Sequence, residues 1–164
     1  MSIEEIAFHE AGHAAMSIIL NLPFNYISIE PDGEFSGTVN PGDDFKSLLE
    51  RVLRNRYVTD DEKIVLRKYV MVIYAGPMSH GFYLKNPFWQ YYLAGDSDYQ
   101  QAYQILQLIY VTEPEKTDKR IELRDDTMLL IQEDETQEII KKIANALLTG
   151  KHRLTYQECL EVLK

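Results

Sequence analysis

Hydrophobic residues near the N-terminus recur every three or four positions, which is typical of one face of a helix. The members of this face are Ile3, Ile6, Ala7, Ala14 and Ile18. Ser2 followed by Glu5 forms a capping-box pattern, and the segment Asn21-Leu22-Pro23 ends the helical spacing. A helix is therefore predicted from about residue 3 to about residue 20.

The next segment alternates between hydrophobic and polar residues, which is typical of a strand with one buried face. Residues 27–30 alternate in this way, residues 31–33 (Pro-Asp-Gly) signal a turn, and residues 35–39 suit a returning strand. The pattern predicts one β-hairpin and leaves room for a further edge strand.

Helical spacing returns after residues 43–44 and predicts an amphipathic helix up to Arg56. Asp60 or Asp61 is expected to cap a further helix, whose later part, residues 69–78, is apolar all round and therefore expected to be buried. Pro77 is expected to kink or end that helix, because proline removes a backbone donor.

The C-terminal half also has mostly helical spacing. A helix is predicted from about Asp96 to about Val111, and a long one that ends at Leu148. The highly charged residues 112–126 between them are expected to form a solvated, mobile connection. Thr155 and Glu158 form a second capping box, which predicts a short final helix.

Together these elements predict one domain over residues 1–164, mainly α with a small β-hairpin or sheet (α+β). The net charge of −9 would repel a nucleic acid. No segment approaches the ~20 apolar residues of a membrane span. The single cysteine, Cys159, and an acidic N-terminus that is unlike a secretion signal suit a soluble cytoplasmic protein.

The first predicted helix contains the sequence FHEAGHA, in which His9, Glu10 and His13 form a His-Glu-x-x-His motif. Histidines four apart lie on one face of a helix and can bind one Zn²⁺ ion from the same side. The glutamate can then take a proton from zinc-activated water. The alternative is that both histidines are polar residues at the edge of a core; the motif inside a capped helix favours the metal.

A catalytic zinc needs a third protein ligand. Between Lys63 and Thr112 the only acidic residues are Asp96 and Asp98, at the start of a predicted helix. One can cap the helix, and a second acid in so acid-poor a stretch suits a metal ligand. His80 is the second candidate for this ligand.

These motifs resemble the peptidase domain of the FtsH-type ATP-dependent zinc proteases. FHEAGHA, a hairpin, YAGPMS, AGDSDYQQA and the ending IANALLTGKHRLTYQECLEVL follow the order of that family's motifs over essentially the whole chain. The resemblance implies an FtsH-type fold with zinc bound by His9, His13 and Asp98, and Glu10 as the catalytic base. It also implies that the hairpin edge near Gly37 holds an extended peptide.

The chain departs from that family in four places. Residues 77–80 replace its arginine and glutamate, Tyr103 replaces a threonine, and residues 43–60 resemble an added helix. The chain also lacks the family's ATPase module and membrane anchor, and no G-x-x-x-x-G-K-[ST] phosphate loop occurs in it. These departures concern substrate fit and subunit packing more than zinc binding.

The sequence therefore predicts a zinc-dependent endopeptidase that hydrolyses unfolded or flexible polypeptides without a motor of its own. The alternative is a non-catalytic zinc-binding interaction module derived from such a peptidase, against which the retained Glu10 argues. The sequence is compatible both with a homo-oligomer and with a separate ATPase partner. Tyr83, Tyr91 and Tyr92 are the candidates for stabilising the oxyanion.

Overall fold

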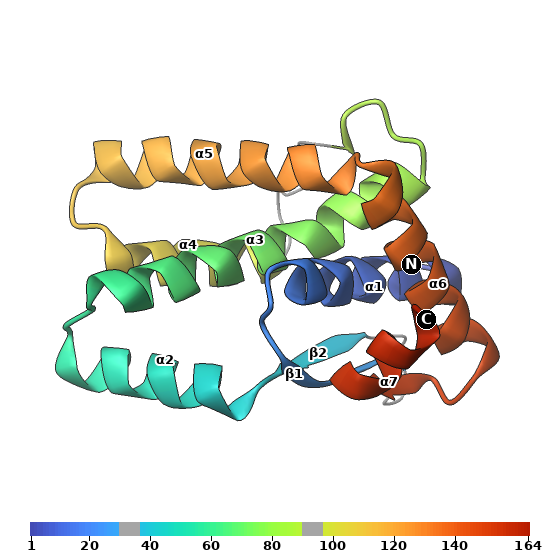
Figure 1. Ribbon diagram of the computed structural model, residues 1–164. Helices are drawn as coiled ribbons and strands as arrows, with labels where there is room; N and C mark the ends of the chain where they lie inside the picture. Colours follow the sequence, from blue (N-terminus) through green and yellow to red (C-terminus); the bar gives the residue numbers. More distant parts are fainter. Residues whose placement is uncertain (30–36, 90–96) are drawn as a thin grey trace.

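The computed structural model describes residues 1–29, 37–89 and 97–164, and helices dominate this part of the chain (Figure 1). In chain order the elements are α1 (Ile3–Ile19), β1 (Phe24–Ser28), β2 (Thr38–Pro41), α2 (Asp43–Asn55), α3 (Asp60–Tyr83), α4 (Ser97–Ile109), α5 (Glu113–Ile131), α6 (Asp134–Thr149), β3 (Arg153–Thr155) and α7 (Tyr156–Val162). The predicted mainly helical fold with a small sheet is confirmed. None of the described helices combines the length and apolarity needed to cross a membrane.

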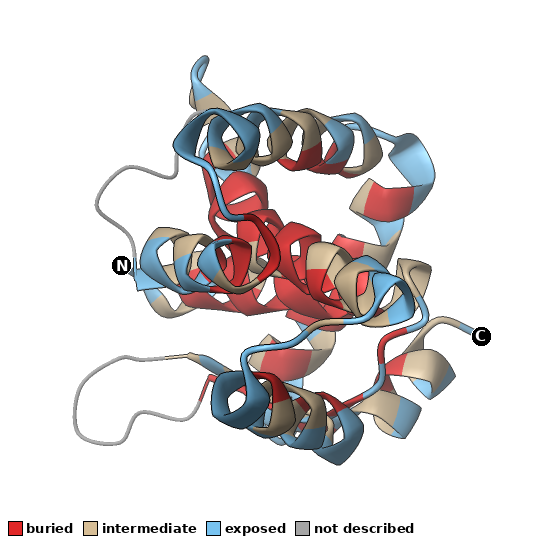
Figure 2. Cartoon of the chain, turned by 90° about the vertical axis from the view of Figure 1, so that its left-hand side faces the viewer, coloured by how far each residue is buried: buried red, intermediate tan, exposed pale blue. Residues whose placement is uncertain are grey.

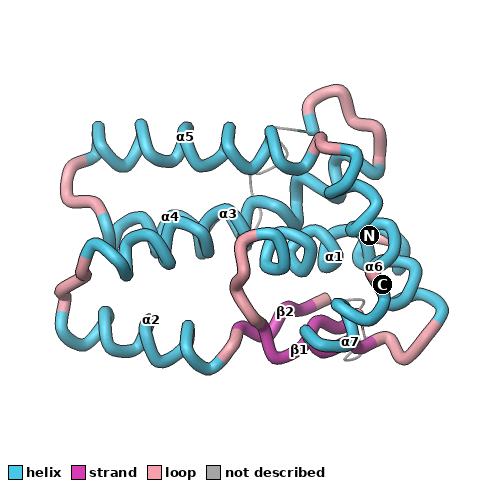
Figure 3. Tube along the Cα trace, in the orientation of Figure 1, coloured by secondary structure: helices cyan, strands magenta, loops and turns pink. Residues whose placement is uncertain are grey.

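The three strands form one small antiparallel sheet beside the helices (Figure 3). Its order is β2-β1-β3, so the predicted hairpin is present; the other edge is formed by the C-terminal strand β3, which the sequence pattern did not predict. The Arg153 guanidinium lies 3.9 Å from the centre of the Tyr26 ring, a cation–π contact that ties β3 to β1. The returning strand begins at Thr38, and the first residues predicted for it, 35 and 36, lie outside the described residues.

Helix α1 lies at the centre of the core, packed against α3, α6 and the sheet, and buried residues concentrate along it (Figure 2). Gly12 makes the close approach of α1 to α3 feasible. A Cβ atom at this position would overlap the Ser79 side chain and the Ala75 carbonyl oxygen. The small residues of the FHEAGHA segment therefore bring the backbone of α3 up to the motif.

The capping boxes predicted at Ser2 and Thr155 are both present. For α3, however, the prediction of Asp60 or Asp61 as the cap is wrong. Thr59 has extended backbone angles and its hydroxyl accepts a hydrogen bond from the Glu62 amide, while the Glu62 carboxylate accepts one from the Thr59 amide. The two aspartates lie inside the first turn instead.

Pro77 does not end α3, because the helix continues to Tyr83. Proline inside a helix costs about 3 kcal/mol, through a lost hydrogen bond and a clash with the preceding turn. This helix packs against α1, α4 and α5, and Pro77 itself is buried. Tertiary packing therefore outweighs the local preference to stop.

The charged segment 112–126 was predicted to be a mobile connection, and this prediction is wrong. It forms most of α5, whose buried positions Leu123, Thr127 and Ile131 recur every four residues. The charges lie on its outer faces, where Glu122 pairs with Arg67 of α3. The predicted long helix to Leu148 begins only at Asp134, as α6.

Candidate metal centre

Helix α1 presents the two motif histidines on one face, one turn apart. The Nε2 atoms of His9 and His13 lie 3.1 Å from each other, and their rings meet edge to face at 75°. Both side chains are buried, with 9% and 7% of their residue surfaces exposed. The two Nε2 atoms thus lie close together in residues that line a cavity.

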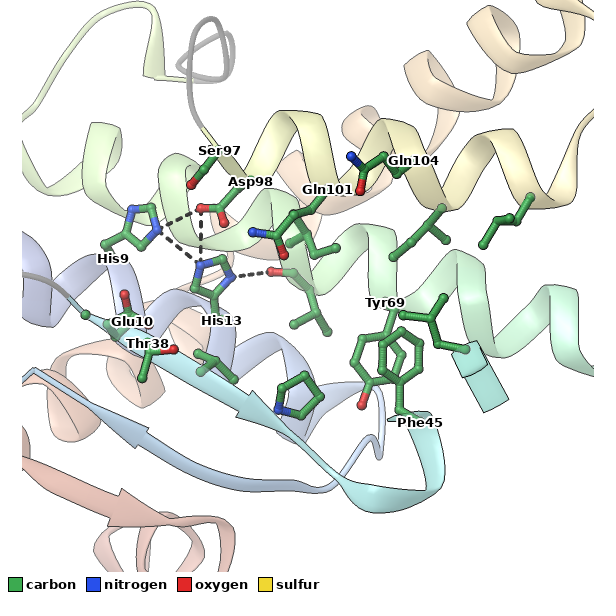
Figure 4. A pocket seen from close by; sticks show the side chains of 18 of the residues that line it. His9, Glu10, His13, Thr38, Phe45, Tyr69, Ser97, Asp98, Gln101 and Gln104 are labelled. Atoms are coloured by element: carbon green, nitrogen blue, oxygen red, sulfur yellow. Dashed lines mark hydrogen bonds and ion pairs between the residues drawn. The ribbon is translucent and has the colours of Figure 1, made fainter. Parts of the chain in front are cut away.

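Asp98, in the first turn of α4, supplies a third donor atom to the same point (Figure 4). Its Oδ2 atom lies 2.9 Å from Nε2 of His9 and 3.4 Å from Nε2 of His13. Zinc–nitrogen and zinc–oxygen bonds of about 2.0–2.1 Å place tetrahedral ligand atoms about 3.3–3.4 Å apart. The sides of the triangle that these three atoms form, 2.9, 3.1 and 3.4 Å, are at or below this spacing, so the group could hold a metal ion.

The backbone of α3 fixes the orientation of the His13 ring. Nδ1 of His13 lies 2.8 Å from the Val72 carbonyl oxygen, and a carbonyl can only accept, so this nitrogen donates. The hydrogen bond leaves Nε2 as the atom available to a metal, which is the usual outer-shell arrangement of zinc-bound histidine. Nδ1 of His9 has no such partner among the described residues.

Gly76 of α3 leaves the space that the His13 ring occupies. A Cβ atom at this position would overlap the Nε2 and Cε1 atoms of the imidazole. The sequence reasoning missed both Gly76 and the Val72 carbonyl as parts of the site. A backbone carbonyl has no sequence signal, whereas the Ala-Gly pair at 75–76 was visible but was considered only as part of a family segment.

The charges of the site stabilise each other. Burial opposes the charged form of His13, but the Asp98 carboxylate, with a smaller contribution from Glu10, raises the pKa of His13 from 6.5 to about 9. Burial likewise opposes ionisation of Asp98, but the two histidines hold its pKa well below the usual range. In the metal-free protein, a proton on His13 thus partly substitutes for a cation at this point.

Glu10 is buried, with 5% of its surface exposed, and lies between the histidines and strand β2 (Figure 4). A Cβ atom at Gly37, just before β2, would overlap the Glu10 carboxylate. Glycine at this position therefore lets the strand backbone approach the proposed base closely. The carboxylate is near enough to His13 to contribute to its raised pKa.

Of the other predicted candidates, only His80 and Tyr83 are among the described residues, and both lie outside the three-residue group. His80 is buried on α3 with its ring centre 6.2 Å from that of His9, and its Nε2 atom is 3.9 Å from a Glu5 carboxylate oxygen. It is not part of the three-residue group. Tyr83 stacks on Phe8 with ring centres 4.1 Å apart and is not among the residues that line the cavity. Asp96, Tyr91 and Tyr92 lie outside the described residues.

The three donor atoms and Glu10 open onto a cavity of about 780 Å³. One wall is the edge of the sheet at Gly37, Thr38 and Val39, and the opposite wall is α4. A cavity of this size is in the range of small-molecule and peptide-side-chain sites. The donors are therefore accessible to a ligand, as a catalytic rather than a closed structural zinc site requires.

No protein-family model matches this sequence, and none of the curated proteins matches it. The FtsH-type relationship therefore stays a prediction that rests on the motifs.

Proposed function

We propose that the protein is a zinc-dependent endopeptidase that cleaves unfolded or flexible polypeptides. The observation that carries this proposal is the triangle of His9 Nε2, His13 Nε2 and Asp98 Oδ2, with the buried Glu10 carboxylate beside it. A purely structural zinc site has four protein ligands and gains nothing from a general base. The described residues supply three donors, a base and an open cavity, which favours a catalytic centre.

His9, His13 and Asp98 would hold the metal. When bound, zinc supplies Lewis-acid chemistry, polarising a carbonyl group and lowering the pKa of water toward about 7. Glu10 accepts a proton from water as the water attacks the scissile carbonyl, and returns it to the leaving amine. The Glu10 carboxylate lies against Gly37 at the edge of the sheet, which supports a proton transfer beside an extended chain bound along β2.

Strand β2 is an edge strand, so its outer backbone groups are available to pair with a peptide. Gly37, Thr38 and Val39 line the cavity at that edge. Strand addition requires a substrate segment with free backbone N–H and C=O groups, which unfolded chains offer and folded proteins mostly do not. The substrate class proposed here follows from that requirement.

The test compares cleavage of unfolded casein by the wild type with that by Glu10→Gln, while zinc content is measured on both proteins. The amide cannot take a proton from water, so Glu10→Gln should keep zinc and lose cleavage by about 100-fold or more. Glu4→Gln, an exposed glutamate on the same helix, is the matched control and should cleave like the wild type. Cleavage that survives in Glu10→Gln would refute Glu10 as the base, and a zinc-loaded wild type without cleavage would favour the non-catalytic module.

A further inference from the structure

The cavity continues beyond His13 as a channel between α2, α3 and α4. We define this side channel by six residues, Phe45, Leu49, Leu53, Tyr69, Ile73 and Ile105, all of which line the cavity. On α2, the three contributors recur every four residues and so lie on one face of the helix. The apolar face of this amphipathic helix therefore lines the cavity.

Helix α4 connects the channel directly to the metal centre. Asp98, Gln101 and Ile105 are three and four residues apart and share one face of the helix. Figure 4 shows Gln101 and Gln104 following Asp98 along this wall, with Phe45 and Tyr69 beyond His13. The channel is therefore an extension of the proposed active site.

The walls of the channel suit an apolar side chain within a polypeptide. Beyond the metal centre, Arg56 carries the only charged side chain among the described residues that line the cavity. The exposed carboxamides of Gln101, Gln104 and Gln107 offer both donors and acceptors, as pairing with a peptide backbone requires. An apolar surface beside neutral hydrogen-bonding groups matches neither a nucleic acid nor a charged small molecule.

Helix α2, whose apolar face lines the channel, is held in place by α3. It is attached to α3 by the stacked rings of Phe45 and Tyr69, 3.2 Å apart, and by an ion pair between Arg51 and Glu62. Further along the same face Leu53 is 48% exposed, although it lines the cavity. Because Leu53 lines the cavity and still keeps about half of its surface in water, it has apolar area that a ligand can cover.

We propose that the side channel binds a bulky apolar side chain of an extended polypeptide whose backbone lies at the metal centre, so that α2 sets the sequence preference. This inference rests on the proposed function for the identity of the ligand as a polypeptide. It adds that the segment corresponding to the predicted added helix, residues 43–60, selects substrates.

The test measures binding rather than cleavage, with zinc-loaded Glu10→Gln as the background. The probes are two fluorescein-labelled, Gly/Ser-rich unfolded peptides, identical except that one carries a single phenylalanine where the other has serine. Burial of one aromatic side chain should make the phenylalanine peptide bind about tenfold or more tightly by fluorescence anisotropy. Leu49→Asp and Leu53→Gln should each reduce this ratio toward one.

Glu50→Gln is the matched control, because Glu50 is exposed on α2, does not line the cavity, and should leave the ratio unchanged. If Leu49→Asp disturbs folding, Leu53→Gln decides, since Leu53 is half in solvent already. Equal affinities, no binding of either peptide, or a preference that survives in Leu53→Gln would overturn the inference, even if the wild type cleaves casein. Selective binding by a protein that cleaves nothing would instead support the channel and refute the endopeptidase.

Discussion

At the scale of single residues, the contact between Gly76 and His13 links the packing of α3 to the proposed metal site. We expect Gly76→Ala to weaken zinc binding by about tenfold or more, because the new methyl group overlaps the ligand atom Nε2. Competition with a chelator measures this affinity. Gly12→Ala also overlaps α3, but at Ser79 and Ala75, so it should lower the unfolding free energy with a smaller effect on zinc. Equal zinc affinity in Gly76→Ala and the wild type would contradict the arrangement.

The raised pKa of His13 predicts how zinc binding depends on pH. In the metal-free protein the pKa of His13 is about 9, above its ordinary value of 6.5, so His13 is protonated at neutral pH. Zinc must then displace this proton to bind. Zinc affinity should therefore rise by up to tenfold per unit between about pH 7 and pH 9 and level off above that. Titrations in buffers of different ionisation enthalpy would measure proton release in this window. A pH-independent affinity would show that His13 is not protonated before zinc binds.

The same shift predicts the stability of the metal-free protein. Because the pKa of His13 is higher in the folded chain than in the unfolded one, its charge stabilises the fold fully below about pH 6.5 and loses this effect as the pH rises through about 9. Urea unfolding of the metal-free protein at a series of pH values would measure this. Stability that rises over the same range would contradict the assigned sign.

How much of the site could be predicted differs from residue to residue. His9, Glu10 and His13 lie within one helical turn, so their relative placement follows from helix geometry alone. Asp98 is distant in the sequence; the scarcity of acids pointed to Asp96 and Asp98 together, and only the family resemblance implied Asp98. Val72 could not have been identified, because it acts through a backbone oxygen whose position depends on how α3 packs.

At the scale of elements, substitutions at the start of α3 can test whether Thr59 is the residue that caps this helix. Thr59→Ala should lower the free energy of unfolding by about 1 kcal/mol, because it removes the acceptor for the Glu62 amide. Asp61→Ala, at an exposed position of the first turn, should cost only a few tenths of that. Urea denaturation gives both values. A larger loss for Asp61→Ala would favour the original sequence prediction over the observed cap.

The elements predicted correctly were those with local signals. Residues 3–20 carry a cap, a regular apolar spacing and a clear ending, and the observed helix differs from the prediction by one residue at its end. Helix α5 was not predicted because its segment is highly charged and only three of its positions are buried, which is too weak a pattern to recognise without the packed structure. The alternative that Pro77 ends the helix was wrong for the same physical reason, since the packing of α3 outweighs the preference of one residue.

At the scale of the whole molecule, the proposed cleft predicts which substrates are cleaved. The wild type should cut unfolded casein and spare a stable folded protein, because only an extended segment can pair with the β2 edge. ATP should make no difference, since the chain carries no phosphate-loop motif. Gel assays with and without ATP would measure both. Rapid cleavage of a stable folded protein would contradict strand addition as the binding mode.

The proposed function depends most directly on the metal. Elemental analysis of the purified protein should find about one zinc per chain in the wild type and little in Asp98→Asn, because the amide loses the charge and donor strength of the carboxylate. Circular dichroism should show the same helical content in both proteins. Full zinc occupancy in Asp98→Asn, or a wild type that binds no zinc when supplied with it, would contradict a zinc centre formed by His9, His13 and Asp98.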